Sequence, residues 1–245
     1  MAHRFYSEEA PAPSGLCFLS EADAHHARRV LRLRSGDSVE LIADGRRWSA
    51  RLQEQDGRLA AMPEQELPST EPRLQLTLFQ GLPKADKMEW IIQKAVELGV
   101  VRIVPVRMSR CVVQLGPKDI PRKLERWQRI AREAGKQSGR CVIPEIAPPA
   151  DLKELPSLTS RLGGCVVPWE ECGGIGPRAY AGAHPDPGSL GIVIGPEGGI
   201  APEEMELLRP ACEPITLGRR ILRTETAGLA AASAFLALYG EMELF

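Results

Sequence analysis

The sequence predicts an α/β protein in which a small N-terminal β-barrel precedes a larger domain built on a mainly parallel sheet. Three observations predict this class. Several short strands crowd the first 70 residues, a proline-rich segment follows them, and strands then alternate with helices to the end of the chain. Parallel strands that are joined by helices form a sheet covered on both faces. We therefore expect two domains, residues 1–70 and 73–245.

The first 70 residues contain one strong hairpin signal and one helix signal. Asp44-Gly45 joins two strand-like segments, as in a tight β-hairpin, and Asp56-Gly57 leads into a further strand. Ser20 with Asp23 three residues later is typical of a helix N-terminus, so we expect a helix that runs through residues 25–33. Other expected features are strands at 16–19, 38–43 and 46–53, a strand after residue 57, and a linker at 63–72.

Beyond the linker, apolar periodicity predicts the remaining elements. The helix expected at 86–98 has apolar residues at offsets 0, 3, 4, 7 and 8, and Gly99 is its natural C-terminal residue. Strands are expected at 74–80, 100–106, 141–146, 164–169, 190–195 and 214–218. Further helices are expected at 121–137, at 151–155, from Pro202 and from about Glu225, with a long surface loop at 173–188.

Composition limits the classes of function. The 245 residues include 43% hydrophobic and 26% charged residues, which favours a globular protein. The formal net charge of −1 provides no global attraction to nucleic acid, so any RNA-binding surface must be local. The chain has no apolar signal region, its six cysteines follow no regular spacing, and no metal-ligand pattern is present. These features predict a cytoplasmic protein with reduced thiols, no membrane segment and no metal.

Two segments combine glycines or charges with the ends of predicted strands. IGPEGG at 194–199 and LGRRILRTETA at 217–227 each follow an apolar strand directly. Open α/β sheets bind ligands beyond the carboxyl ends of their strands, and glycines there allow a ligand close to the backbone. The alternatives are a simple turn for the first segment and, for the second, a helix capped by Thr224 with Glu225 in its first turn. A cap does not explain the three arginines.

These two motifs, with the helices KADKMEWIIQKAVELGV and ERWQRIAREAGKQSGR, closely resemble the RsmE family of the SPOUT superfamily. The resemblance runs nearly end to end. It implies methylation of N3 of a uridine in the small-subunit (16S) ribosomal RNA with S-adenosyl-L-methionine as methyl donor. It also implies a trefoil-knotted C-terminal region, a PUA-like N-terminal barrel and a homodimer. GGIG at 173–176 lies too late in the chain for a Rossmann-type methyltransferase.

The resemblance also assigns the site residues. The expected cofactor-binding residues are Ile194, Gly195, Pro196, Glu197, Gly198, Gly199, Leu217, Gly218, Ile221, Leu222, Arg223, Thr226 and Ala227. Methylation at N3 requires loss of a weakly acidic proton, so a cation and a proton acceptor are needed. We hypothesise that Arg223 stabilises the uracil oxygens and that Glu197 or Glu225 accepts the proton. The alternative for each carboxylate is an ion pair with a neighbouring arginine.

Two basic regions and two lysines are candidates for RNA contact. The expected residues are Arg28, Arg29, Arg32, Arg34, Arg46, Arg47, Lys84, Lys87, Arg126, Arg129, Arg132 and Lys136. Solvated faces are the alternative for both regions, and the lysines could instead face the cofactor pocket. A noncatalytic RNA-binding or ribosome-assembly protein with the same fold is the competing function. A nucleotide-dependent enzyme ranks well behind, because the chain lacks G-x-x-x-x-G-K-[ST].

Overall fold

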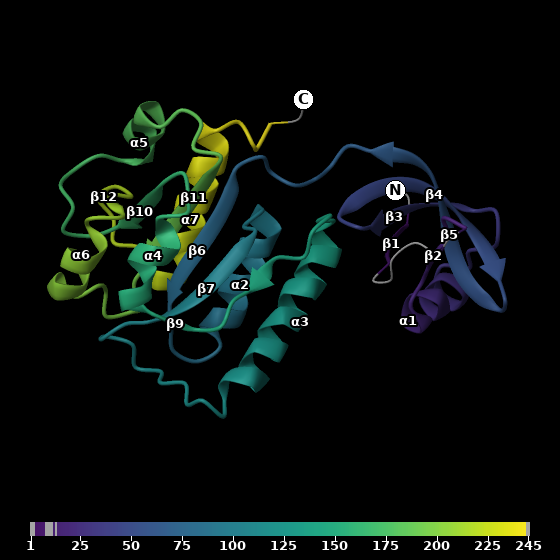
Figure 1. The fold of residues 1–245 in the computed structure, drawn as a ribbon, viewed down its shortest axis with the longest axis horizontal. Coiled ribbons are helices and arrows are strands. Elements are labelled where there is room, and N and C mark those ends of the chain that lie inside the picture. The colour runs from purple at the N-terminus through teal and green to yellow at the C-terminus, as the bar shows by residue number, and fades with distance from the viewer. Residues whose placement is uncertain (1–2, 8–11, 13, 244–245) are drawn as a thin grey trace. The chain divides into compact units, whose positions relative to one another are not determined.

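The computed structural model describes residues 3–7, 12 and 14–243. The chain divides into two units (Figure 1). The N-terminal unit comprises Met1–Glu71 with Gly139–Val142, and the C-terminal unit comprises Pro72–Ser138 with Ile143–Phe245. A short segment from the second half of the chain therefore belongs to the N-terminal unit.

The N-terminal unit contains a five-stranded sheet in the order β1-β3-β4-β5-β2. Its strands are β1 (Arg4–Tyr6), β2 (Cys17–Phe18), β3 (Ser38–Ala43), β4 (Arg46–Gln55) and β5 (Arg58–Leu67). The expected hairpin at Asp44-Gly45 is confirmed, because β3 pairs with β4 in antiparallel register. The strand expected after residue 57 is β5, and it forms a second antiparallel hairpin with β4. Asp44 and Gly45 have φ values of 50° and 70°, and Asp56 and Gly57 have φ values of 51° and 76°. Positive φ at both central residues is what a type I′ turn requires.

The helix of the N-terminal unit begins as expected and ends earlier. In α1 (Glu21–His25) the Ser20 hydroxyl accepts the Asp23 N–H at 3.1 Å. The helix continues as the π-helical turn η1 (His26–Val30) and does not reach residue 33. The Leu33 N–H bonds the carbonyl of Ala27, six residues back, while Arg32 has a φ of 57°. This helix end usually carries a glycine, and its absence removed the stop signal from the sequence.

The expected linker at 63–72 is wrong in its first half. Strand β5 extends to Leu67, and Pro63 lies opposite Ala50 where the register with β4 shifts. Proline is tolerated at such a bulge because its missing N–H is not needed there. Glu64 and Glu66 pair with Arg51 at 2.7 Å and Arg46 at 3.6 Å on β4. Only residues 68–74 lie between β5 and the next strand.

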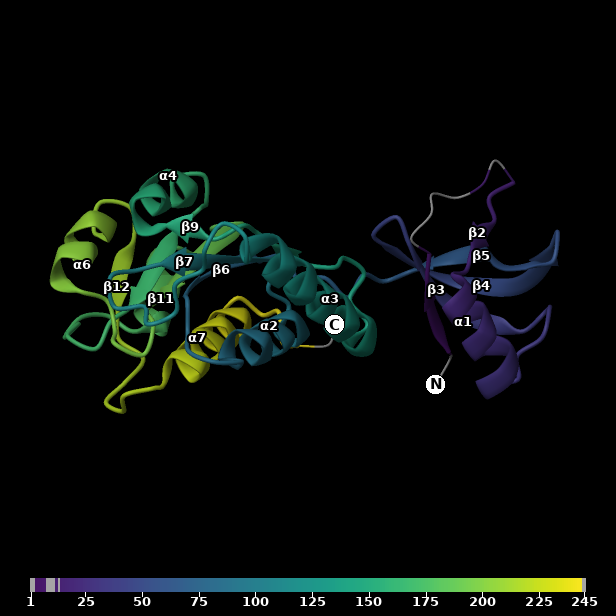
Figure 2. The same ribbon diagram turned by 90° about the horizontal axis from the view of Figure 1, so that it is seen from below.

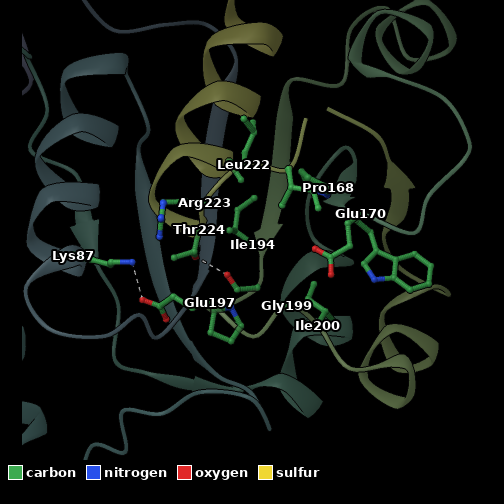
Figure 3. A pocket seen from close by; sticks show the side chains of 15 residues that line it. Lys87, Pro168, Glu170, Ile194, Glu197, Gly199, Ile200, Leu222, Arg223 and Thr224 are labelled. Carbon is green, nitrogen blue, oxygen red and sulfur yellow. Dashed lines mark hydrogen bonds and ion pairs between the residues drawn. The ribbon is translucent and has the colours of Figure 1, made fainter. Parts of the chain in front are cut away.

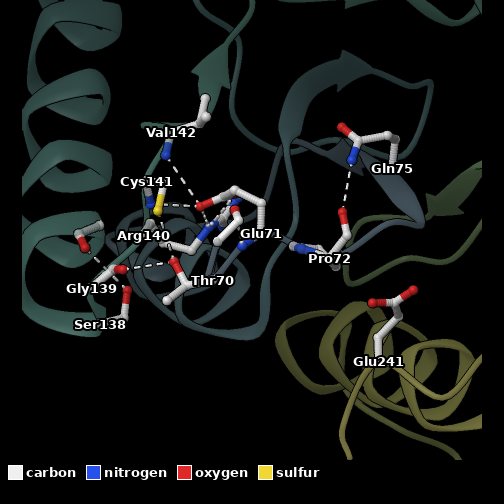
Figure 4. A network of polar contacts seen from close by, with 12 residues as sticks. Thr70, Glu71, Pro72, Gln75, Ser138, Gly139, Arg140, Cys141, Val142 and Glu241 are labelled. Atoms are coloured by element: carbon white, nitrogen blue, oxygen red, sulfur yellow. Dashed lines mark hydrogen bonds and ion pairs between the residues drawn. The ribbon is translucent and has the colours of Figure 1, made fainter. Parts of the chain in front are cut away.

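A buried ion pair holds the segment at 139–142 (Figure 4). The Arg140 guanidinium, whose side chain is 4% exposed, lies 2.5 Å from the Glu71 carboxylate. The same carboxylate accepts the N–H groups of Cys141 at 2.7 Å and Val142 at 3.2 Å. Because Glu71 takes these N–H groups, the strand expected at 141–146 is reduced to β8 (Glu145–Ile146).

The C-terminal unit contains a seven-stranded sheet in the order β12-β10-β11-β6-β7-β8, with β9 also paired to β7. Its other strands are β6 (Gln75–Gly81), β7 (Arg102–Arg107), β9 (Ala150–Asp151), β10 (Cys165–Pro168), β11 (Ser189–Ile194) and β12 (Glu213–Ile215). Every pairing in this sheet is parallel, which confirms the expected parallel sheet. The carboxyl ends of β6, β10 and β11 therefore lie along one edge.

Helices cover both faces of this sheet (Figure 2). They are α2 (Lys87–Leu98), α3 (Ile120–Ser138), η2 (Leu152–Glu154), α4 (Leu155–Thr159), α5 (Pro177–Ala183), α6 (Pro202–Leu208) and α7 (Thr224–Leu238). One buried apolar cluster joins the sheet to α2, α3, α5 and α7, and another joins it to α4 and α6. The periodicity of α2 is confirmed, since its five expected apolar residues are buried and Gly99 has a φ of 109°.

The helix expected at 151–155 and the loop expected at 173–188 need correction. The first is longer, because η2 continues directly into α4. The second contains α5, whose Tyr180 ring packs edge-on against Phe235 with a centroid distance of 5.6 Å. One buried aromatic ring thus fixes a helix in a segment whose glycines and prolines are typical of a loop.

Three general features concern the described part of the chain. All six cysteines are free thiols, as expected. Within residues 3–7, 12 and 14–243, no helix is long and apolar enough to cross a bilayer. Among the same residues, no three His, Cys, Asp or Glu side chains are grouped so that they could hold a metal ion.

The Glu71–Arg140 pair leads to a stability prediction. Glu71→Ala should lower the free energy of unfolding by about 3–5 kcal/mol, because a buried guanidinium loses its carboxylate. Glu64→Ala is the matched control, since its partner Arg51 has a 54% exposed side chain, and it should cost at most about 1 kcal/mol. Urea unfolding followed by tryptophan fluorescence measures both. Equal costs for the two variants would contradict the structural role of the buried pair.

Candidate active site

A cavity of about 390 Å³ opens where β10 and β11 end and α7 begins (Figure 3). It is lined by Lys87, Pro168, Trp169, Glu170, Ile194, Gly195, Pro196, Glu197, Gly199, Ile200, Ile221, Leu222, Arg223, Thr224 and Ala227. Both sequence motifs, IGPEGG and LGRRILRTETA, contribute to this one cavity. Two segments separated by residues 200–216 thus meet at the edge of the sheet where a ligand is expected.

A second cavity of about 430 Å³ lies against the first. The two share Pro168, Trp169, Glu170, Ile221, Leu222 and Ala227 in their walls. Leu217 and Gly218 line only the second cavity. Gly198 and Thr226, which the sequence also placed at the cofactor, line neither of the two. The carbonyl oxygen of Gly198 instead accepts a hydrogen bond from Arg110 at 2.9 Å.

Glycines allow the ends of β6 and β11 to lie very close together. A Cβ atom on Gly81 would lie 2.7 Å from the backbone nitrogen of Pro196. A Cβ atom on Gly195 would lie 2.9 Å from the side chain of Ile200. Gly199 has a φ of 71° and closes the turn with a hydrogen bond to the Pro196 carbonyl at 2.9 Å. The turn that forms one wall of the cavity therefore requires glycine at these positions.

Thr224 connects three elements at the cavity wall. Its hydroxyl donates to the Gly195 carbonyl at 2.6 Å and accepts from the Gln80 amide nitrogen at 2.9 Å. The alternative in which Thr224 caps α7 is wrong, because Arg223 is the N-cap and Thr224 is the first helical residue. The Thr224 hydroxyl is used across the sheet edge instead of on its own helix. This links β6, β11 and α7.

Lys87 lies between the two carboxylates that the sequence proposed as proton acceptors. Its ammonium lies 3.0 Å from Glu197 Oε1 and 3.1 Å from Glu225 Oε2. The Lys84 N–H also donates to Glu197 at 3.1 Å. The alternative that each carboxylate pairs with a neighbouring arginine is therefore wrong, because the ion-pair partner of both is a lysine. One lysine, expected at RNA, bridges both carboxylates.

These contacts determine the charge of the site. Burial opposes ionisation of Glu197, but hydrogen bonds from its own N–H, from Lys84 and from Lys87 outweigh it, and its pKa lies below the usual value. The pKa of Glu225 is lowered in the same way: burial is outweighed by its own N–H, by Lys87 and by the charge of Arg223. Both glutamates raise the pKa of Lys87. At neutral pH all three groups are charged.

The residues expected at RNA differ in their acidic partners and in their exposure. Arg28 pairs with Glu54, and Arg46 and Arg47 pair with acids on neighbouring strands. On α3, Arg126 pairs with Glu89 at 2.7 Å. The residues Arg29, Arg32, Arg34, Lys84, Arg129 and Arg132 are exposed, and Lys136 is half-buried. Acidic partners thus reduce the positive charge of both basic regions, and the sequence count did not reveal this.

Sequence reasoning missed several residues of the cavity. Trp169 and Glu170 follow the end of β10, a strand that the sequence did predict. The rule that ligands lie beyond strand ends, applied to this strand as well, would have found them. Gln80, which lines neither cavity but bonds the wall residue Thr224, was missed because a glutamine at a strand end carries no sequence signal for a contact 144 residues away.

Comparison with known families and structures defines the class of the protein. A family described as an RNA methyltransferase domain matches residues 70–236. A second, described as an RNA methyltransferase PUA domain, matches residues 19–60. The first match alone covers more than half of the chain. The fold with its strand-end cavity is thus that of an RNA methyltransferase with a PUA domain.

Individual relatives narrow the class to one family. The ribosomal RNA small subunit methyltransferase E of Bacillus subtilis is 37% identical over 93% of this chain and 90% of its own length. The Aquifex aeolicus enzyme of that name is 31% identical over 96% of this chain and 99% of its own length. A Neisseria gonorrhoeae structure of that name, bound to S-adenosyl methionine, has a TM-score of 0.82 and 32% sequence identity. The match covers 99% of this chain and 100% of the Neisseria chain. The chain belongs to the ribosomal RNA small subunit methyltransferase E family, which confirms the resemblance to RsmE.

The close approach of β6 and β11 leads to a second stability prediction. Gly81→Ala should lower the free energy of unfolding by about 1–3 kcal/mol, because its Cβ would overlap the backbone at Pro196. Gly182→Ala is the control: it lies in α5 with nothing within 4 Å of its added Cβ. An alanine there should stabilise the protein by up to about 1 kcal/mol. Urea unfolding measures both, and an undiminished stability of Gly81→Ala would contradict the packing described.

Proposed function

We propose that the protein transfers a methyl group from S-adenosyl-L-methionine to N3 of a specific uridine in the 16S ribosomal RNA of the small subunit. One observation carries the proposal: in a member of this methyltransferase family, both glycine- and arginine-containing motifs line one cavity beyond the strand ends. The names of the relatives indicate small-subunit ribosomal RNA as the substrate, and the Neisseria structure, which is bound to S-adenosyl methionine, indicates the methyl donor.

The cavity fits this methyl donor. Its volume of about 390 Å³ falls in the range of ~300–1,000 Å³ that is usual for cofactor sites. Ile194 and Leu222 offer apolar surface for an adenine, and the backbone at Gly195 and Gly199 offers polar groups. Glu170 places a carboxylate in the wall of both cavities, where an amino acid ammonium would bind. We propose the cofactor residues expected from the sequence, with Glu170 and Thr224 added.

The residues of the cavity would then have separate roles in the reaction. S-adenosyl-L-methionine brings an already activated methyl group, so the protein must supply position and charge. Arg223, exposed in the cavity wall, stabilises the uracil oxygens as N3 loses its proton. Glu197 or Glu225, both ionised, accepts that proton. The N3–carbon bond forms as the sulfur–carbon bond of the donor breaks.

The wider organisation of the protein is part of the same proposal. Residues 1–70 would form a PUA-like RNA-binding barrel, and residues 73–245 a SPOUT domain whose C-terminal part forms a trefoil knot. Support comes from the PUA family match and from the five-stranded N-terminal sheet. We also propose a cytoplasmic homodimer that needs no metal, and RNA contact through the twelve basic residues named from the sequence. Of these, Arg29, Arg32 and Arg34 are exposed on the N-terminal unit.

The proposed function has a direct test. Incubation with labelled S-adenosyl-L-methionine and small ribosomal subunits or their RNA should place the label on N3 of a single uridine. Nucleoside digestion and mass spectrometry locate it. A protein that binds the RNA but neither binds the cofactor nor transfers label would instead be the noncatalytic RNA-binding or assembly protein.

The role of Arg223 has a test of its own. Arg223→Ala should lower kcat by about 100-fold or more, because one preorganised charge no longer stabilises the uracil anion. Arg178→Ala, an exposed arginine on α5 that lines neither cavity, is the control and should keep wild-type turnover. Cofactor affinity, measured by calorimetry, should be unchanged in Arg178→Ala, and in Arg223→Ala it separates a loss of binding from a loss of turnover at saturating cofactor. Unchanged turnover of Arg223→Ala would exclude the role.

A further inference from the structure

Lys87 is held more firmly than a solvent-exposed lysine. Its ammonium contacts Glu197 at 3.0 Å and Glu225 at 3.1 Å, so it is fixed from the turn after β11 and from the first turn of α7. Its own backbone begins α2. Three elements that also form the cavity thus determine the position of this one ammonium.

The two carboxylates leave part of the ammonium for another partner. An ammonium has three N–H donors, and the carboxylates account for two of them. The side chain remains 30% exposed and lines the cavity together with Arg223. A third donor is therefore available in the cavity that we propose for methyl transfer.

The charge of this cluster favours a neutral base over a phosphate. Lys87 contributes one positive charge and Glu197 and Glu225 one negative charge each, so the three groups together carry one negative charge. A phosphate would be repelled by the two carboxylates. A uracil carries no charge before the reaction, and its two carbonyl oxygens, which flank N3, accept hydrogen bonds. This differs from the phosphate contact that the sequence suggested for Lys87.

We infer that Lys87 is a further catalytic residue, whose third N–H donates to a carbonyl oxygen of the target uracil beside N3. The inference rests on the proposed function. As the N3–H proton passes to Glu197 or Glu225, negative charge develops on that oxygen, and the ammonium stabilises it. The electron pair on N3 then forms the bond to the methyl carbon. The bond between that carbon and the donor sulfur breaks, which leaves a neutral thioether.

The test compares Lys87→Met with Lys94→Met. Lys94 lies on the same helix, pairs with Glu97 at 2.9 Å and does not line the cavity, so its variant should keep wild-type kinetics. Lys87→Met should lower kcat by about 100-fold. Its KM for RNA and its calorimetric affinity for S-adenosyl-L-methionine should stay within about twofold, since the contact strengthens only in the transition state.

A pH profile separates this role from a structural one. The charged groups that face the two carboxylates are Lys87 and Arg223, while the nearby Cys111 thiol, whose pKa is raised by burial, is neutral. Without Lys87 the pKa values of Glu197 and Glu225 rise. Because the reaction needs an ionised carboxylate, the acid limb of the kcat/KM profile should move to higher pH in Lys87→Met.

Two results would overturn the inference. One is wild-type kcat in Lys87→Met. The other is a loss confined to RNA affinity with a flatter salt dependence, which would identify a phosphate contact. Lys87→Gln, which keeps a polar end without the charge, carries the same expectations if Lys87→Met does not fold. The wild-type protein in the same assay shows whether methyl transfer occurs at all, so a failure of the proposed function is seen there.

Discussion

The site depends on two consecutive hydrogen bonds, the second of which ends at a backbone carbonyl. Gln80 at the end of β6 donates to Thr224 at the start of α7, and Thr224 donates to Gly195 at the end of β11. Gln80 is fully buried, and Thr224 is 7% exposed, so water does not compete for these bonds. These two hydrogen bonds hold Ile194, which precedes Gly195, and Arg223, which precedes Thr224, in the wall of the same cavity. Gly81 permits the close approach of β6 to Pro196, Gly195 permits the tight turn that follows β11, and the Thr224 hydroxyl holds the two strand ends to α7.

Charge is arranged differently in the cavity and on the surface. In the cavity, Lys87 is surrounded by two carboxylates, and Arg223 stands at the N-cap of α7 with its side chain exposed. On the N-terminal sheet, cross-strand acids neutralise several arginines that the sequence counted as a patch. A methyl donor that is already activated needs little more than position and charge from the protein, and the cavity provides both.

Much of the fold could be predicted from the sequence, because local signals determine it. The hairpin at Asp44-Gly45, the apolar period of α2 and the glycines at 194–199 all act within a few residues. The errors arose where distant residues decide the local structure. Glu71 removes the strand character of Cys141 and Val142, and the packing of Tyr180 on Phe235 turns an expected loop into α5. Within the site, the two motifs were visible in the sequence, whereas the bridge from Lys87 to both carboxylates was not.

The affinity of Thr224 variants for S-adenosyl-L-methionine, measured by calorimetry, tests whether the Thr224 hydroxyl holds the cofactor site together. Thr224→Val keeps the shape of the side chain but removes the hydroxyl between Gln80 and Gly195. We expect its binding to weaken by about tenfold, which corresponds to the ~1–3 kcal/mol that an unsatisfied buried group costs. Thr224→Ser keeps the hydroxyl and should bind as the wild type does. Equal affinity of the valine variant and the wild type would contradict the claim that this hydroxyl unites the two motifs into one site.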